Sequence, residues 1–477
     1  MSATPLAGLQ PARICGRAAR IRGHLGVRAL SSYSHDAESL ATTVKVHSLI
    51  RLFREHGHCI AKQDPLHRPR WKPVEAPSLA LFASDAPVSS ENLTAAVGAP
   101  LSVDDQVFIG NELLGGKTWW RMGDVITFLK SAYCGSIGVE YMHLANGEHR
   151  SWWRERFERV CDRGEAEHHL VPHRSADAQR RSFELLLEAD RFEHALATRF
   201  PAAKRFGLEG GEVLMPALHA LVQRAADLGV NTVELGTSHR GRLNLLHGLL
   251  GKPFGHICAE FADDGTHPHV GDVRYHLGTT GELVTPNGGR VHLSLSPNPS
   301  HLEAVNPVVL GGARAKQDRL AARGHARADA ARRVMPLLLH GDAAFAGQGL
   351  VAETLQLCGL DDYSTGGSVH VVLNNQIGFT TNPQSSRSTR YPTDVGKVVS
   401  APILHVNADD VEACVRALEL AAEWRQHAQQ DVIIDLVGAR SPQISPDLPR
   451  SPALPRPCMI LTGRAHRYNR LPQVRPQ

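Results

Sequence analysis

The segment 334–349, VMPLLLHGDAAFAGQG, constrains the fold more than any other part of the chain. Between Val334 and Leu339 its apolar side chains do not alternate with polar ones, which is typical of a strand covered on both faces of a parallel sheet. Ligands of such sheets bind beyond the carboxyl ends of the strands, and Asp342 lies at that position. The segment therefore predicts an α/β fold with a binding site at the end of this strand.

A second apolar segment, Val369 to Leu373, predicts a neighbouring strand, and polar residues follow it as well. Asn375 lies 33 positions after Asp342, a spacing that fits one strand-helix-strand crossover with Val351 to Cys358 as the helix. The carboxyl ends of the two strands would then lie side by side. We therefore expect Asp342 and Asn375 at adjacent positions of one crevice.

The side chains and backbone at these two strand ends suit a magnesium ion. They offer carboxylate, amide and backbone carbonyl oxygens, and Mg²⁺ prefers a few protein oxygens together with phosphate oxygens and water. Gly341, Gly347 and Gly349 would let backbone N–H groups approach a diphosphate. Taken alone, however, an Asp at a strand end is more often a helix cap or a turn residue, so the surrounding segments must decide.

Two longer segments resemble a known family. LLHGDAAFAGQGLVAETLQL and VHVVLNNQIGFTTNPQSSRSTRYPTDVGKVVSAPILHVNADDVEA are similar to the E1 component of 2-oxoglutarate dehydrogenase complexes, and they contain a Gly-Asp and double-Asn motif typical of thiamine diphosphate enzymes. The resemblance implies a thiamine diphosphate-binding fold, with a doubly wound, largely parallel sheet after a helical N-terminal region. It assigns Mg²⁺ to Asp342, Asn375 and Ile377, and cofactor contacts to Arg242, Asp342, Ala343, Asn375 and Ile377.

Loop histidines supply the candidate catalytic residues. The strand 232–235 ends before SHRGRLN, where Arg242 stands beside a helix N-terminus and is well placed to bind a diphosphate. A lone His is more often a satisfied core or cap residue, but the match of HRGRLN to the family favours a site role. The resemblance implies that His239, His301 and His340 line the active site and that Phe206 flanks the substrate cleft.

Composition excludes several classes of protein. The chain has 477 residues, enough for roughly three domains, and no apolar run approaches the ~20 residues of a membrane span. The formal net charge of +4 comes from Arg-rich ends, so the segment between them is net acidic, which argues against nucleic-acid binding. The eight cysteines include no C-x-x-C pair, so neither a zinc site nor a disulfide framework is indicated.

Five segments are expected along the chain. Residues 1–35 hold several Arg and no acidic residue, which resembles a mitochondrial transit peptide and predicts the mitochondrial matrix. An N-terminal helical segment with a connector (36–105), a helical region (106–205) and the thiamine diphosphate-binding α/β domain (206–438) follow. The family pattern stops after Gly438, and the Pro- and Arg-rich tail 439–477 shows no apolar periodicity, so we expect it not to pack.

The resemblance predicts an E1 enzyme that decarboxylates 2-oxoglutarate on thiamine diphosphate and passes the succinyl group to the lipoyl group of E2. Its expected partners are a second copy of the chain, dihydrolipoyl succinyltransferase (E2) and dihydrolipoyl dehydrogenase (E3). Two alternatives stay open. GLLGKP and HLEAVNP are also similar to the 2-oxoadipate E1, although YPTD and GFTTNP favour 2-oxoglutarate. The second alternative is a non-catalytic form that binds cofactor or a complex partner. It stays open because the family's pyrimidine-binding half, with its activating glutamate, is not recognised in this sequence.

Overall fold

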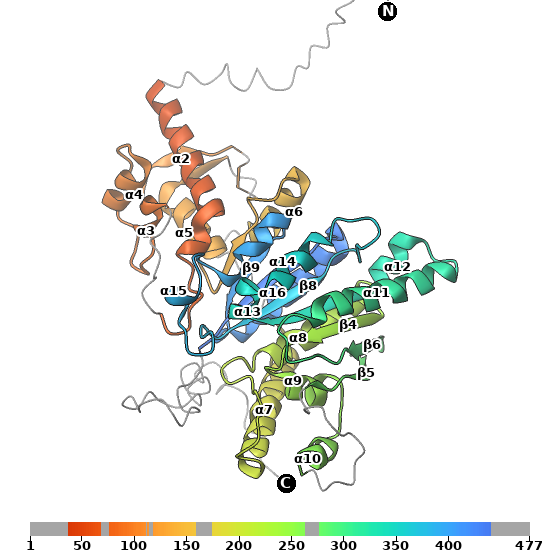
Figure 1. The fold of residues 1–477 in the computed structure, drawn as a ribbon. Helices are drawn as coiled ribbons and strands as arrows, with labels where there is room; N and C mark the ends of the chain where they lie inside the picture. Colours follow the sequence, from red (N-terminus) through yellow and green to blue (C-terminus); the bar gives the residue numbers. More distant parts are fainter. Residues whose placement is uncertain are drawn as a thin grey trace, which may run out of the picture.

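An eight-stranded sheet forms the centre of the computed structural model, which describes residues 37–67, 76–110, 112–113, 118–158, 174–262 and 276–439. The strand order is β3-β9-β10-β8-β7-β4-β6-β5. Figure 1 labels β9, β8, β4, β6 and β5 of this sheet. The inner strands run parallel, and the edge strands β3 and β5 run antiparallel to their neighbours. The strands are β3 Ile137–Glu140, β4 Thr232–Thr237, β5 Thr279–Val284, β6 Arg290–Leu295, β7 Val334–Gly341, β8 Val369–Asn374, β9 Ile403–Asn407 and β10 Val432–Val437, with β1 Gln106–Phe108 and β2 Trp119–Arg121 in a separate antiparallel pair.

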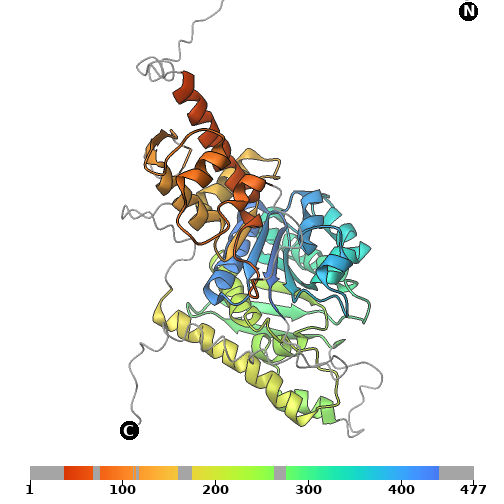
Figure 2. The same cartoon turned by 90° about the vertical axis from the view of Figure 1, so that its left-hand side faces the viewer.

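Helices lie along both faces of the sheet, and the long helix α7 runs along one end of the molecule (Figure 2). In chain order the helices of the described residues are α2 Ala37–His56, η1 Gly57–Cys59, α3 Pro77–Ala80, α4 Ser90–Val97, α5 Met122–Tyr133, α6 Gly147–Phe157, α7 Ala176–Arg199, α8 Leu214–Asp227, α9 Arg242–Asn244, η2 Leu245–Leu249, α10 Phe254–Ala262, α11 Val305–Ala322, α12 Arg327–Arg333, α13 Asp342–Gly347, α14 Gly349–Gln356, α15 Pro383–Ser386, η4 Pro392–Val399 and α16 Val411–Ala428.

The two faces of β7 pack against different helices. Leu337 and Leu339 belong to the large core that includes α8 and α16, whereas Leu338 packs against Val305 and Val309 of α11. Because helices cover both faces of the sheet, side chains on both faces of β7 are buried. The strand therefore consists of consecutive apolar residues without alternation. The predicted doubly wound, largely parallel α/β fold after a helical N-terminal region is confirmed.

The N-terminal helices form a layer beside the β3 edge of the sheet, seen at the upper left of Figure 1. Strand β3 comes from the segment 106–205, which the sequence presents as a helical region, and it pairs with β9. This segment therefore contributes a strand to the main sheet as well as helices. Trp152 and Trp153 of its helix α6 lie with their ring centroids 5.2 and 5.3 Å from that of Trp424 on α16, as expected of packing residues.

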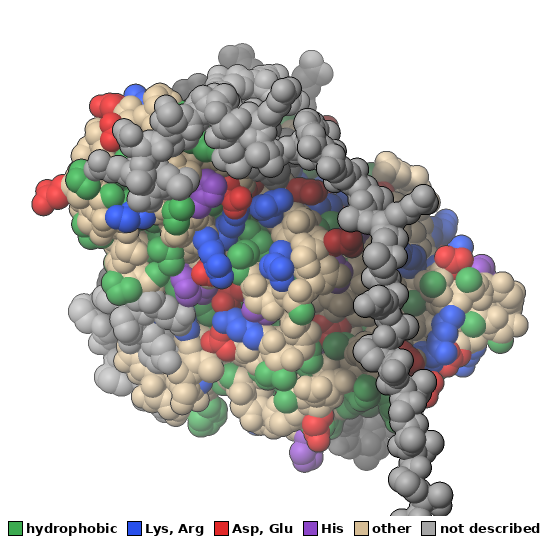
Figure 3. Space-filling model, turned by 90° about the horizontal axis from the view of Figure 1, so that it is seen from above, with side chains coloured by type: hydrophobic (Ala, Val, Ile, Leu, Met, Phe, Trp, Pro, Cys, Tyr) green, Lys and Arg blue, Asp and Glu red, His purple; other side chains and the backbone are tan. Residues whose placement is uncertain are grey.

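Residues 1–36 and 440–477, with the predicted leader and nearly all of the predicted tail, lie outside the described part of the chain. Within the described part, no helix has both the length and the apolar character that crossing a bilayer requires. On the face drawn in Figure 3, Lys and Arg side chains are interspersed with Asp and Glu and form no continuous basic patch among the described residues.

Candidate active site

Four loops with candidate residues meet at one edge of the sheet. Strands β6, β4, β7 and β8 are consecutive neighbours and parallel, so their carboxyl ends lie in a row. His239 follows β4, His301 follows β6, Asp342 follows β7 and Asn375 follows β8. The structure therefore brings the sequence-predicted residues to one crevice edge, where parallel sheets bind ligands.

Asp342 and the turn 375–377 lie next to each other. In the β7–β8 register Gly341 pairs with Leu373, so the next residues of both strands continue side by side. A Cβ added at Gly378 would lie 2.9 Å from the Cβ of Ala343, which places the chain after the turn directly against the start of α13. A side chain at Gly378 would therefore force the turn and the start of α13 apart.

Hydrogen bonds fix the shape of the turn 375–377. Asn375 Oδ1 accepts from the N–H of Ile377 at 3.2 Å, and Asn374 Oδ1 accepts from the N–H of Gln376 at 3.1 Å. Gln376 has a left-handed backbone with φ of 61°, which is uncommon for a residue other than glycine. Its Nε2 donates to Asp64 Oδ1 at 3.1 Å and to the carbonyl of Gly438 at 3.0 Å, so the N-terminal region also holds the turn.

Asp342 is a buried carboxylate with little neutralisation. It is 4% exposed, and the nearest cation, Arg387, lies with Nη1 3.6 Å from Asp342 Oδ2, beyond hydrogen-bond length. Burial raises the pKa of Asp342 to about 6; Arg387 opposes this shift and Asp435 adds to it. Buried carboxylates are normally paired or bound to metal, so the donor set of Asp342 and Asn375 fits Mg²⁺.

Three glycines close to Asp342 in the chain have no atoms of the described residues packed against them. A Cβ added at Gly341, Gly347 or Gly349 would meet nothing within 4 Å, so these positions border open space. Arg387 contributes buried N–H groups at the same place. Oxygen ligands for a cation and N–H donors for an anion thus occur together, which is the combination that a magnesium diphosphate needs.

Arg242 does not fit the cofactor contact expected for it. Its side chain is fully buried, and its guanidinium donates to backbone carbonyls of Leu277 at 2.7 Å, Ser296 at 2.6 Å and Thr237 at 3.3 Å. Burial lowers the pKa of this guanidinium to about 10. Arg242 therefore ties the loops after β4 and β6 together, and its hydrogen-bond donors are already used.

His239 and Phe206 lie together beside the end of β4. Their ring centroids are 4.3 Å apart, and the N–H of Gly241 donates to the carbonyl of Phe206 at 2.8 Å. Burial lowers the pKa of His239, and the nearby Arg240 and His276 lower it further. A neutral imidazole both donates and accepts hydrogen bonds, so His239 can hold or move a proton near a substrate.

The histidine of β7 occupies a different place from the one expected. His340 is fully buried on the face of the sheet covered by α11, and its Nδ1 lies 2.6 Å from Glu303 Oε2. Its Nε2 lies 3.1 Å from Nδ1 of His370 on β8, and burial lowers the pKa of His340. His340 therefore cannot touch a keto acid directly, and any influence on the crevice passes through Glu303.

Glu303 reaches the crevice where His340 does not. A small cavity of about 10 Å³, room for about one water, is lined by Ser238, Asn298, His301 and Glu303 among other residues. His301 is exposed at its edge. Glu303 Oε1 and Asn298 Oδ1 are buried and accept no hydrogen bond from the described residues. The sequence did not indicate either acceptor, because the burial of these loop residues depends on contacts with residues distant in the sequence.

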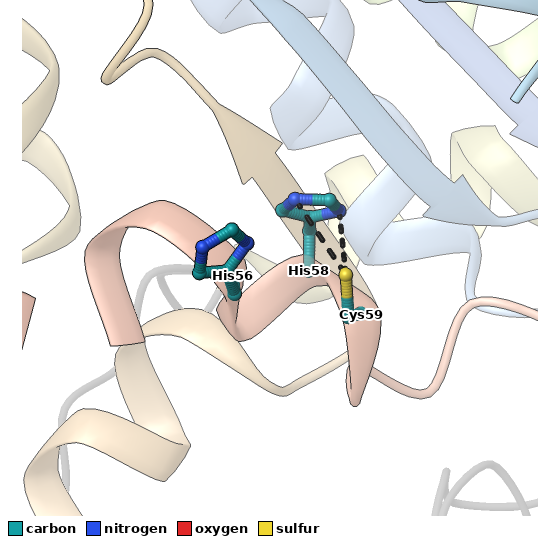
Figure 4. A group of neighbouring side chains, drawn as sticks. All are labelled: His56, His58 and Cys59. Atoms are coloured by element: carbon teal, nitrogen blue, oxygen red, sulfur yellow. Dashed lines mark hydrogen bonds between the residues drawn. The ribbon is translucent and has the colours of Figure 1, made fainter. Parts of the chain in front are cut away.

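A second group of histidines lies away from the crevice, where η1 follows α2. His56, His58 and Cys59 have ligand-type atoms within 4.8 Å of one another, and Figure 4 shows Cys59 Sγ below the ring of His58. The ligand-type atoms of His58, Glu140 and His405 also lie within 4.8 Å of one another. Nε2 of His405 lies 3.0 Å from Glu140 Oε1, and Nδ1 of His405 lies 2.9 Å from Asp435 Oδ2.

Cations of the chain already neutralise this second group. Lys397 Nζ lies 2.6 Å from Glu140 Oε2. Burial alone would lower the pKa of His405, but its hydrogen bonds to Asp435 and Glu140 outweigh burial and raise the pKa to about 9. Both ring nitrogens of a protonated His are donors and cannot bind a metal, so we interpret the group as a buried charge network.

Comparison with known proteins identifies the family to which this chain is similar. The model of the family described as "Dehydrogenase E1 component" matches residues 186–443. The mitochondrial 2-oxoglutarate dehydrogenase of Dictyostelium discoideum is 41% identical over 416 residues, covering 85% of this chain and 38% of the relative. The 2-oxoglutarate dehydrogenase E1 component of Brucella anthropi is 40% identical over 464 residues, covering 95% and 44%.

The chain thus spans less than half the length of these relatives. The family match includes all four strand ends of the crevice, together with Asp342, the turn 375–377 and His239. Because the matching model covers more than half of the chain, the fold and the sequence lead to the same conclusion. This chain belongs to the dehydrogenase E1 component family.

Proposed function

We propose that this chain supplies the diphosphate- and magnesium-binding part of a thiamine diphosphate-dependent 2-oxoglutarate dehydrogenase E1. The observation that carries the proposal is the position of buried Asp342 at the end of β7, beside the end of β8, with its neighbour Ala343 packed against Gly378. The relatives named 2-oxoglutarate dehydrogenase support the choice of keto acid.

The proposed roles of the chain's residues follow from their positions. Asp342, Asn375 and the backbone of Ile377 hold Mg²⁺, and Ala343 at the start of α13 lies against the cofactor's diphosphate. When bound there, thiamine diphosphate would supply a carbon nucleophile for the 2-oxo carbon and an electron sink for the decarboxylation.

The remaining candidates act on the substrate. His239 and His301 donate hydrogen bonds to the distal carboxylate of the keto acid, because one is held neutral beside the crevice and the other is exposed at its edge. Phe206 packs against the His239 ring and restricts its motion. The hydrogen bond with Glu303 holds His340 in its buried position, where it does not contact the substrate.

The proposal extends to partners and location. A homodimer is what the family resemblance implies, and association with E2 and E3 follows from the proposed transfer of a succinyl group to a lipoyl arm. The acid-free, Arg-rich segment 1–35 and the mitochondrial relative from Dictyostelium support the mitochondrial matrix.

The metal site is tested by Asp342→Asn. Removing the charged ligand should weaken magnesium-dependent binding of thiamine diphosphate, and of inorganic pyrophosphate as a smaller probe, by more than about tenfold in titration calorimetry. Asp409→Asn is the matched control, since Asp409 is exposed at the start of α16. Equal affinity of the Asp342 variant and the unmodified chain would refute the assignment.

Substrate choice is tested by competition between two keto acids. With cofactor and Mg²⁺ present, 2-oxoglutarate should be consumed in preference to 2-oxoadipate. A preference for 2-oxoadipate would instead indicate a 2-oxoadipate dehydrogenase E1. Cofactor binding without turnover of either keto acid would favour a binding role instead.

A further inference from the structure

Arg387 is a buried cation with two nitrogens, Nε and Nη1, that donate no hydrogen bond to the described residues. It follows α15 in the segment after β8, and its side chain is 8% exposed. Its Nε and Nη1 are buried and make no hydrogen bond with the described residues. Buried guanidinium groups are normally paired, because an unpaired buried N–H group loses its water without replacement.

Two arginines of the loop after β4, Arg240 and Arg242, have their partners within the chain. Arg242 is saturated by backbone carbonyls, and Arg240 donates to the carbonyl of Gly207 at 2.8 Å and to Glu209 Oε2 at 3.1 Å. The contact of Arg387 with Asp342, at 3.6 Å, is electrostatic and satisfies neither group by hydrogen bonding. Arg387 therefore presents donors to an acceptor that the described residues do not provide.

We propose that Arg387 binds a phosphoryl oxygen of the diphosphate, directly beside the metal held by Asp342. The inference rests on the proposed function and adds to it the residue that anchors the anion. A guanidinium presents parallel N–H groups that match two phosphate oxygens, and a cation next to Asp342 compensates the negative charge that a diphosphate brings.

A purely structural role for Arg387 predicts a different behaviour. If Arg387 served only to hold Asp342, its loss would weaken the binding of Mg²⁺ alone as well as that of magnesium pyrophosphate. If Arg387 binds the anion, its loss should weaken magnesium pyrophosphate, while Mg²⁺ alone should bind equally well or more tightly, since one repelling positive charge is gone. The two titrations separate these roles.

The experiment compares Arg387→Gln and Arg387→Lys with the unmodified chain, using inorganic pyrophosphate with Mg²⁺ and Mg²⁺ alone in titration calorimetry. We expect pyrophosphate affinity to fall about tenfold to a hundredfold for Arg387→Gln, and less for Arg387→Lys, which keeps the charge but loses the two-point contact. Arg290→Gln is the matched control, because Arg290 lies on β6 and pairs with Glu282 on the surface.

The outcomes distinguish this inference from the proposed function. Unchanged pyrophosphate affinity in both Arg387 variants, with binding lost in Asp342→Asn, overturns the role of Arg387 and leaves the metal site standing. Absence of pyrophosphate binding by the unmodified chain overturns both. Thermal unfolding of each variant shows whether it is folded, and Arg387→Lys keeps the test decisive if Arg387→Gln does not fold.

Discussion

His405 carries its proton inside the sheet, between Glu140 and Asp435. The raised pKa of about 9 means that the folded state holds this proton more tightly than an unfolded chain does. Its contribution to stability is fully present below the ordinary His pKa of about 6.5 and disappears as pH rises through about 9. The same hydrogen bonds that bury a charge therefore make the fold sensitive to alkaline pH.

We expect the free energy of unfolding to fall by on the order of 3 kcal/mol between pH 6.5 and 9.5, from the shift of His405 alone. Urea denaturation across this range measures the change. Two other titratable groups are close to His405: His58, which is neutral in this range because burial lowers its pKa to about 4, and the cationic Lys397. Glu140→Gln should flatten the profile; an unchanged slope in that variant would contradict the assignment.

Individual site residues were predictable to different degrees. Asp342 and Asn375 could be placed from the sequence because each directly follows an unbroken apolar strand, and parallel neighbours bring strand ends together. The sequence could not show that the hydrogen-bond donors of Arg242 are already used, because they bind carbonyls 35 and 54 residues away in sequence. The burial of His340 likewise depends on α11, which precedes it in the chain.

At the scale of elements, the start of α16 distinguishes two neighbouring aspartates. Asp409 and Asp410 both precede the first residue of α16, but Asp410 Oδ1 accepts from the N–H of Ala413 at 3.2 Å, whereas Asp409 is exposed. Asp410 also accepts from the hydroxyl of Ser136 at 2.7 Å. One carboxylate therefore caps α16 and links it to the chain before β3.

Asp410→Ala should lower the free energy of unfolding by about 1 kcal/mol or somewhat more, since it removes a cap and a second hydrogen bond. Asp409→Ala should change it by less than about 0.5 kcal/mol, as expected at an exposed position. Denaturant midpoints of the two variants provide the comparison. Equal losses in both would show that the cap is shared.

The strands of the parallel core were predictable, whereas the sheet edge was not. Segments 334–341 and 369–374 have the length and the β-branched or apolar content of buried strands, and both form. Strand β3 is only four residues long and lies between helices, so no local pattern marks it. Its position follows from pairing with β9, whose residues lie more than 260 positions later in the sequence.

At the scale of the whole molecule, the N-terminal region reaches the proposed metal site. Asp64, just after η1, accepts a hydrogen bond from Gln376, 312 residues later in the chain. The left-handed backbone of Gln376 sits between Asn375 and Ile377, so this bond holds the middle of the metal-binding turn. The N-terminal layer is thus part of the site's support.

Asp64→Ala should weaken magnesium pyrophosphate binding about twofold to tenfold, the usual worth of one hydrogen bond, with little change in thermal unfolding. Titration calorimetry measures the affinity, and Asp104→Ala, at an exposed acidic position of the same layer, is the control. Full affinity in Asp64→Ala would mean that the carbonyl of Gly438 and Asn374 hold the turn without it.

The hydrogen bond between Asp64 and Gln376 also lets ligand binding at the turn affect the N-terminal segment. Coupling free energies are reciprocal, so a contact that helps the turn to bind its ligand must let the ligand hold the N-terminal segment in place by the same factor. Saturation of the turn with magnesium pyrophosphate should therefore slow amide hydrogen exchange across residues 57–67. Occupancy of the crevice would then be reported at the opposite end of the polypeptide, among residues that never touch the ligand.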